Sequence, residues 1–328
     1  MGVVVLFVLT SQFFLGTVIK GDQSGTTHVT IDENLGALAS TYAPKVWLAK
    51  DENYNPSSVG FHLENVKVYD GATSYSSTPS TLSTCSEDCY MSSNQPLDHA
   101  SATLPFFSGE HVGSTQQPPV YAVVKRINES TTDILYWMFY PYNRGKNVCI
   151  GIHIFGVCIG GYSTFGNHVG DWEYATMRLE DGQPDKLFVS SHDFGGIYDW
   201  DAASETYKKG EDAIETEGTH PILYSALGSH GLWSTPGSHV YKDMPAIIDD
   251  LRDETSNGTA WDTWRNVAFT MYRPDGGYTG SWAWLNFKGR WGNRKDGCSV
   301  EWASGECILN DGATSINYRE YMENNDLA

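Results

Sequence analysis

Strand-like runs separated by turn residues constrain the fold more than any other feature of this sequence. Five runs rich in β-branched and aromatic residues are each bounded by Gly, Pro, Asn or Asp, as strands joined by turns are. Amphipathic helical patterns are scarce, whereas Gly reaches 33 and Tyr 19. This spacing predicts an all-β (mainly β) protein, a β-sandwich or jelly roll with one or two short helices. The five predicted strands are Val120–Lys125, Asp133–Tyr140, Asp171–Leu179, Lys186–Ser191 and His220–Leu227.

The remaining segments predict a leader, one domain and one helix. Residues 1–21 have a short apolar core and are predicted to be a signal peptide, with a membrane-anchored N-terminus as the alternative. Residues 22–328 are predicted to form a single domain that starts with a loose lead-in or an edge strand over residues 22–40. Residues 71–118, rich in Ser, Thr, Pro and Gly, read as a long surface excursion. Asp243–Arg252 is predicted to be a short helix.

Cysteine spacing and sequons point to secretion. The six cysteines form three close pairs, Cys85 with Cys89, Cys149 with Cys158, and Cys298 with Cys307. An even number in local pairs suits three disulfides in an oxidising compartment, and no pair has the two-residue spacing of a zinc finger. With the predicted signal peptide and the N-glycosylation sequons at Asn128 and Asn257, these pairs predict a secreted, extracellular glycoprotein. The lumen of the secretory pathway or vacuole is the alternative compartment.

The charge of the chain excludes one class of partner. A formal net charge of −19 repels phosphate backbones, and no run of Lys and Arg provides a local basic surface. We therefore expect no nucleic-acid partner. Most of the 40 carboxylates are expected to be solvated, so only a clustered few need a functional explanation.

One such cluster lies on the predicted strand that begins near Asp171. Asp171 and Glu173 are two residues apart, so on a strand both carboxylates point to one face while Trp172 points to the other. A bend or bulge at Gly170 would bring the imidazole of His168 to the same face. The three side chains would then offer a divalent cation one nitrogen and two oxygen donors. A simpler interpretation has Asp171 ending a turn, Glu173 solvated and His168 bonded locally in a loop.

Several segments between about residues 42 and 300 carry a resemblance to a known family. They are Tyr42–Ala49, Tyr136–Lys146, Gly166–Glu173, Ala226–Trp233 and Pro236–His239. In combination they resemble the Vps62-type family (vacuolar protein sorting-associated protein 62, DUF946). This resemblance implies the fold, but it implies little about function because the biochemical activity of that family is poorly defined.

A more distant resemblance concerns the strand around Asp171. The pattern His168-x-x-Asp171-Trp172-Glu173 resembles part of the heptapeptide of the NPP1 proteins, which are necrosis- and ethylene-inducing-peptide-like proteins. Two later segments, in the same order, are similar to strands of that family: Val189–Gly196 and His220–Gly231.

The NPP1 resemblance implies a β-sandwich with a divalent-cation site, used to dock onto sphingolipid headgroups and damage membranes. Carried over residue by residue, it makes His168, Asp171 and Glu173 the metal-ligand candidates, with calcium or magnesium preferred and manganese or zinc as alternatives. There are two departures from the family pattern. Gly170 replaces its second histidine, and glycines at 160 and 161 stand where an upstream Asp would help to bind the metal.

Other histidines and aromatic residues could belong to the same pocket. His192 and His230 lie beside Ser or Gly at predicted strand ends, and Trp233 follows His230 closely. These three could line the pocket or support the cation ligands. For His239 we prefer a local hydrogen bond in a loop.

A glycosidase is the enzymatic alternative. Two neighbouring carboxylates on one strand face could stand at the short separation that a retaining mechanism requires. Several Trp residues would then be platforms for sugar stacking, although Trp282 and Trp284 also alternate as they would on a buried sandwich face. The candidate platforms are Trp282, Trp284, Trp291 and Trp302.

The segment Cys149–Cys158 is apolar and tied by a predicted disulfide. If exposed, it would be a constrained hydrophobic loop able to dip into a bilayer; if buried, it would be a hairpin of the core. The sequence leaves both open.

The leading functional hypothesis is a secreted protein that needs a divalent cation to recognise a membrane glycolipid or a carbohydrate surface. It allows membrane permeabilisation in the manner of a toxin, and no catalytic role is assigned to any residue. A glycoside hydrolase using Asp171 and Glu173 is the first alternative. A non-catalytic structural or sorting-related protein is the second. The oligomeric state is not predicted.

Overall fold

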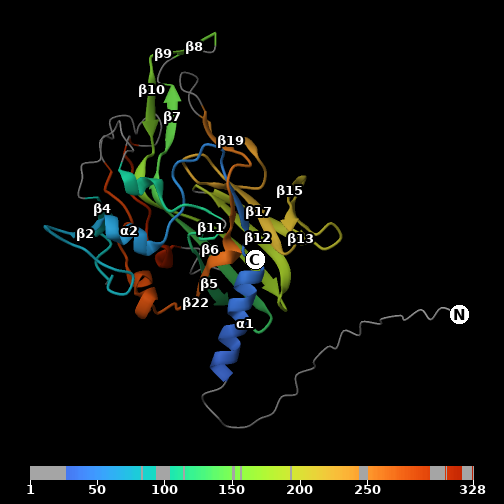
Figure 1. Ribbon diagram of the computed structural model, residues 1–328. Helices are drawn as coiled ribbons and strands as arrows, with labels where there is room; N and C mark the ends of the chain where they lie inside the picture. The colour runs from blue at the N-terminus through green and yellow to red at the C-terminus, as the bar shows by residue number, and fades with distance from the viewer. Residues whose placement is uncertain are drawn as a thin grey trace.

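The computed structural model describes residues 27–82, 84–93, 104–113, 115–149, 152–155, 157–192, 194–243, 250–295, 307, 309–319 and 327 of the chain. Its regular structure is mostly strands, with two α-helices and short 3-10 turns in the described ranges (Figure 1). The predicted fold class is confirmed. The predicted signal peptide, residues 1–21, lies outside the described residues. No helix in the described part of the chain is both long and apolar enough to cross a membrane.

An eight-stranded sheet forms the middle of the structure. Its strand order is β15-β14-β13-β12-β11-β6-β5-β22, and all neighbours are antiparallel except β22 and β5. The strands are β5 (Val120–Arg126), β6 (Thr131–Asn143), β11 (His168–Glu180), β12 (Gln183–Ser191), β13 (Phe194–Asp201), β14 (Thr206–Lys209), β15 (Asp212–Ile214) and β22 (Val267–Met271).

Both faces of this sheet are buried, which explains why β6 reads as a continuous apolar run. Ile134 and Tyr136 pack in a first core, whereas Leu135 and Trp137 pack in a second core on the opposite face. A five-stranded sheet covers the first core and makes this half a β-sandwich. Its strands are β1 (Lys45–Leu48), β16 (Thr216–Glu217), β17 (His220–Ser225), β18 (Leu232–Trp233) and β21 (Ala260–Asp262).

Short elements cover the second core. Helix α2 begins after the N-cap Ser58, whose Oγ accepts a hydrogen bond from the backbone N of Phe61 at 3.1 Å. The other elements on this side and around it are β2 (Lys67–Asp70), β3 (Thr73–Tyr75), β4 (Tyr90–Ser92), η1 (Pro105–Ser108), η3 (Gly280–Asn286) and η5 (Ile316–Tyr318), with α2 spanning Val59–Asn65. Elements β19 (Gly237–Lys242) and β20 (Leu251–Thr255) form a separate pair.

All five predicted strands are confirmed, within a few residues at their ends, as β5, β6, β11, β12 and β17. Two other expectations are wrong. The lead-in over 22–40 is α1 (Thr27–Thr41) across its described part, where Leu35 and Ala39 at helical spacing pack in the first core. The expected helix Asp243–Arg252 lies mostly outside the described residues, which omit 244–249, and its last two residues belong to strand β20.

The second wrong expectation is the surface excursion over residues 71–118. This segment contributes apolar side chains to both cores. They alternate in the chain with polar residues that reach solvent, so the overall polar composition hides them. The buried contributors are Leu82, Cys89, Met91, Phe106 and Phe107 in the second core and Val112 in the first.

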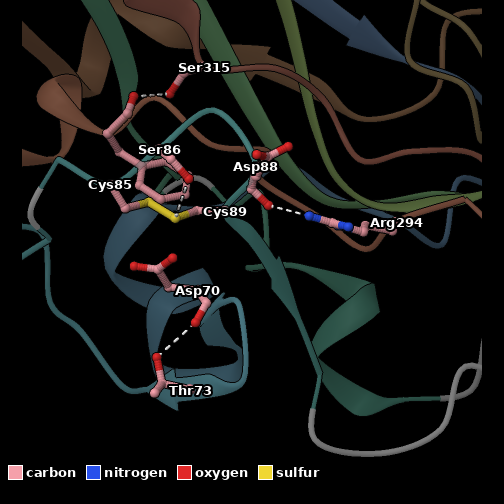
Figure 2. Close-up of a disulfide and its surroundings, with 9 residues drawn as sticks. Asp70, Thr73, Cys85, Ser86, Asp88, Cys89, Arg294 and Ser315 are labelled. Carbon is pink, nitrogen blue, oxygen red and sulfur yellow. Dashed lines mark hydrogen bonds between the residues drawn. A yellow bond between two sulfur atoms is a disulfide. The ribbon is translucent and has the colours of Figure 1, made fainter.

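Two of the three predicted disulfides are present. Cys85 is joined to Cys89 just before β4, and the backbone oxygen of Asp88 in the same loop accepts a 2.6 Å hydrogen bond from Arg294 (Figure 2). Cys149 is joined to Cys158. Cys298, the predicted partner of Cys307, lies outside the described residues.

Both predicted glycosylation sites are exposed. Asn128 lies in the turn between β5 and β6, and Asn257 in the turn between β20 and β21. The Asn128 side-chain nitrogen donates to Thr131 Oγ1 at 2.8 Å, the local bonding expected of a sequon in a tight turn. Glycosylation itself stays a prediction.

Candidate functional site

Strand β11 exchanges its two faces at Gly170. Val169 and Trp172 are three residues apart, yet both pack in the second core, so the strand cannot alternate regularly between them. Gly170 has φ of +66°, and a Cβ on it would lie 2.1 Å from the backbone oxygen of Trp291. Only glycine fits this conformation and this approach.

The exchange of faces puts three predicted residues on the wall of one cavity. His168, Asp171 and Glu173 all line a hollow of about 970 Å³ between β11, the end of β12 and the C-terminal segment. Asp171 and Glu173 are each only 6% exposed. We call this hollow the Asp171 cavity.

The Asp171 cavity carries both signs of charge. Five of the 21 basic side chains in the chain line it, which is a concentration of cations in a protein of net charge −19. Its cations are Lys146, Lys242, Lys288, Arg290 and Arg319, and its acids are Glu87, Asp171, Glu173 and Asp311.

Hydrogen bonds from three neighbouring residues favour the ionised form of Asp171. Its Oδ2 accepts hydrogen bonds from Nδ1 of His230 at 3.1 Å and from Nδ2 of Asn143 at 3.2 Å, and its Oδ1 accepts from the Trp172 backbone. Burial alone would raise the pKa of Asp171, but the His230 hydrogen bond and the nearby positive charges outweigh it and lower the pKa. His230 is fully buried, and its ring stacks on that of Tyr140 with 3.8 Å between the ring centroids. It therefore supports the site without lining the cavity.

Glu173 is shifted the opposite way. Burial and repulsion by Asp171 raise its pKa well above the ordinary value, although the charge of Arg319 opposes the shift. Ser190 donates a long hydrogen bond of 3.4 Å to its Oε2. The two neighbouring carboxyls therefore differ: their surroundings favour the ionised form of Asp171 and disfavour the ionised form of Glu173.

His168 offers one ring nitrogen to the cavity. Its Nδ1 donates to the backbone oxygen of Gly170 at 2.9 Å, and in the neutral ring this leaves Nε2 as the unprotonated atom. A neutral imidazole fixed in this way can bind a cation or accept a proton.

A second network adjoins the cavity and brings His192 and Trp233 together. Both donate to Oδ2 of Asp253, His192 Nε2 at 2.9 Å and Trp233 Nε1 at 2.8 Å. Lys146 Nζ lies 2.6 Å from Oδ1, which also accepts from Ser229 at 2.8 Å. Burial would raise the pKa of Asp253, but His192 and Lys146 lower it well below its usual range. His239 stacks on Trp233 at 4.2 Å, consistent with the local role preferred for it.

Sequence reasoning missed Asp253, Lys146 and Arg319. Leu251, Asp253 and Thr255 alternate on the buried face of strand β20. The sequence pattern of this face is hard to recognise because its central residue is an acid. No pattern along the chain pairs Lys146 with Asp253 more than 100 residues later.

Of the predicted sugar platforms that the structure describes, none lines the Asp171 cavity, and Trp282 is only half-buried. Trp284 and Trp291 are fully buried in the second core, and Trp282 and Trp284 lie on the 3-10 turn η3 instead of a strand. Trp302 lies outside the described residues. Aromatic rings that do line the cavity include those of Phe194 and Tyr241.

A ready-made metal centre is not seen in the described ranges, where no three His, Cys, Asp or Glu side chains are arranged to hold an ion. The donor types nevertheless suit a cation, because His168 Nε2 and the two carboxylates share one wall.

Known proteins show similarity over most of the chain. A family model described as vacuolar protein sorting-associated protein 62 (Vps62) matches residues 18–296. Two similar proteins come from Saccharomyces cerevisiae. The putative vacuolar protein sorting-associated protein TDA6 is 25% identical over 307 residues, and vacuolar protein sorting-associated protein 62 is 29% identical over 225 residues.

These alignments cover 80% and 64% of this chain but only 62% and 45% of the two relatives. The chain thus spans less than two thirds of either relative. No solved structure gives a significant match.

Proposed function

The chain belongs to the Vps62 family, and on that premise we propose that its Asp171 cavity binds the headgroup of a glycolipid, or the equivalent free carbohydrate, with the help of a divalent cation. His168, Asp171 and Glu173 would hold the cation, with calcium or magnesium preferred. The family name does not identify a ligand, so the proposal depends on the cavity.

One observation carries the proposal: two buried carboxylates share a cavity wall and their pKa values move in opposite directions. A bound cation would offset both the burial and the repulsion by Asp171 that raise the pKa of Glu173. The bound ion would then present open coordination positions to hydroxyl groups of a sugar.

The cations of the cavity suggest a headgroup that also bears an anionic group. Arg290 is partly exposed, and its Nη2 lies 3.6 Å from Oδ2 of Asp311. Lys242 is exposed at the end of β19. Basic side chains at a cavity recognise phosphate, sulfate or carboxylate groups. A sugar with one such group would bind the cation through its hydroxyl groups and the basic side chains through its anionic group.

We expect cation binding to compete with a proton on Glu173. Titration of the purified protein with Ca²⁺ or Mg²⁺ by calorimetry should show affinity rising about tenfold per pH unit below the folded pKa of Glu173, because one proton is released. Glu173→Gln should weaken binding by about tenfold or more and remove this pH dependence. Glu180→Gln, at the far end of the same strand, is the matched control. Equal affinity in wild type and Glu173→Gln, or no binding at any pH, would refute the site.

The same glutamate should affect stability. A carboxyl with a raised folded pKa destabilises the protein as pH rises above the unfolded value, about 4.3, because ionisation is costlier in the folded state. Without a divalent cation, Glu173→Gln should therefore melt higher than wild type at neutral pH.

The proposed compartment is the secretory pathway, either outside the cell or in the vacuolar lumen. The disulfides Cys85–Cys89 and Cys149–Cys158 support an oxidising environment. Both yeast relatives are named for vacuolar protein sorting, which favours the luminal alternative.

A glycoside hydrolase is a second candidate, favoured by the raised pKa of Glu173 beside the lowered pKa of Asp171. Pairs whose environments separate their pKa values commonly supply an acid and a base or nucleophile. This candidate predicts release of reducing sugar from a glycan panel, lost in Glu173→Gln. A wild-type protein inert on the whole panel would eliminate it.

A non-catalytic structural or sorting-related role is the third candidate. Arg319 lines the cavity, and its positive charge favours the ionised form of both carboxylates, although the pKa of Glu173 stays raised overall. Its guanidinium could offset their charge without a metal. Failure to bind any cation or glycan would favour this role.

A further inference from the structure

A hairpin arm projects from the sandwich beside the Asp171 cavity (Figure 1). Its stem pairs β7 (Lys146–Cys149) with β10 (Tyr162–Phe165), and its tip pairs β8 (Ile152–Ile154) with β9 (Val157–Ile159). The Cys149–Cys158 disulfide ties the stem to the tip. We call residues 146–165 the arm.

The tip of the arm exposes large apolar side chains. In the described ranges six large hydrophobic side chains are exposed, and four of them belong to the arm. Phe155 is fully exposed at the turn, and Val157 is 64% exposed. The four are Phe155, Val157, Ile159 and Tyr162. Apolar surface concentrated in this way usually marks an interaction site.

The arm is also free of carboxylates. Residues 134–170 contain no Asp or Glu, although the whole chain contains 40. Arg144 is exposed at the base of the stem, and Lys146 begins it. A chain of net charge −19 thus has one projection that an anionic surface does not repel.

We propose that the tip of the arm inserts into the boundary between headgroups and acyl chains of a lipid bilayer. A projecting apolar turn with no groove of its own suits a fluid surface better than a shaped protein partner. Tyr162 stands further back on the stem, where an aromatic ring with a hydroxyl suits the membrane interface. Arg144, which is exposed at the base of the stem, would face anionic headgroups, whereas Lys146 is paired with Asp253.

The position of the arm orients the cavity. Lys146 at the start of β7 and Gly166 just after β10 both line the Asp171 cavity. A stem of four residues per strand rises roughly 13 Å, so an inserted tip would place the cavity mouth just above the headgroup layer. This orientation rests on the proposed function, whereas insertion of the arm does not.

Vesicle flotation tests the arm apart from the cavity. Wild-type protein in a chelator should float with phosphatidylcholine vesicles, and more strongly when they contain phosphatidylserine. Phe155→Asp and Val157→Asp should each weaken binding by at least about tenfold, because a charge replaces a buried apolar group. Val240→Asp, which changes an exposed valine on β19, is the matched control and should bind as wild type does.

Each outcome decides for or against the arm. Unchanged flotation of both tip variants, or no flotation of wild type with either vesicle, overturns the proposal. Equal loss in Val240→Asp overturns it as well, because the effect would then not be specific to the tip. Glu173→Gln should float normally in chelator, and Phe155→Asp should bind Ca²⁺ normally, so failure of the cavity and failure of the arm remain distinguishable.

Discussion

Gly170→Ala is expected to destabilise the protein by about 4 kcal/mol or more, a loss large enough to prevent accumulation of folded protein. The methyl group would sit 2.1 Å from the backbone oxygen of Trp291, and φ of +66° is unfavourable for any L side chain. Neither strain can be relieved without moving β11 or the Trp291 segment out of the second core. Chemical denaturation followed by fluorescence measures the loss.

Gly182→Ala separates the two causes. Gly182, in the turn between β11 and β12, has φ of +77°, but nothing lies within 4 Å of the Cβ it lacks. Alanine there should cost only the backbone term of about 1–2 kcal/mol. Equal losses at positions 170 and 182 would show that the Trp291 contact adds nothing.

Asp253→Asn is expected to cost about 3–5 kcal/mol, because it leaves Lys146 with a positive charge beside a buried neutral group. The amide nitrogen would also face groups that donate hydrogen bonds to the carboxylate now. Since the amide keeps one oxygen, either His192 and Trp233 or Ser229 and Lys146 would lose their acceptor. Thermal unfolding measures the effect. Asp201→Asn, at an exposed pair with Lys208, is the control and should melt close to wild type.

The pH dependence of unfolding checks the same residue. Because the folded pKa of Asp253 is depressed, its stabilising effect is complete above the unfolded value of about 3.9 and is lost as pH falls below it. Wild type should therefore lose its stability advantage over Asp253→Asn on acidification below about pH 4. A constant difference down to pH 2 would contradict the assignment.

The sequence predicts four of the eight strands of the central sheet and one strand of the five-stranded sheet, because these strands are local patterns. β-branched and aromatic runs ended by turn residues locate β5, β6, β11, β12 and β17. Helix α1 was missed because its few apolar residues, such as Leu35 and Ala39, make only a narrow stripe.

The candidate site is predicted only in part, for a different physical reason. The shared wall of His168, Asp171 and Glu173 follows from strand alternation and one glycine. Lys146, Asp253 and Arg319 come from distant segments that meet only in the folded chain, and no local pattern announces them. The opposite pKa shifts of the two carboxylates likewise depend on burial and neighbours that a sequence does not reveal.

The arm enters and leaves the sandwich through one antiparallel pair, Lys146 opposite Phe165. Chain ends that face each other across a ladder can be joined by a two-residue turn. The arm is therefore a detachable module: a shortened chain that closes at this pair would keep the strands that build the cavity. Related proteins could then gain, lose or change the arm without changing the residues that line the cavity.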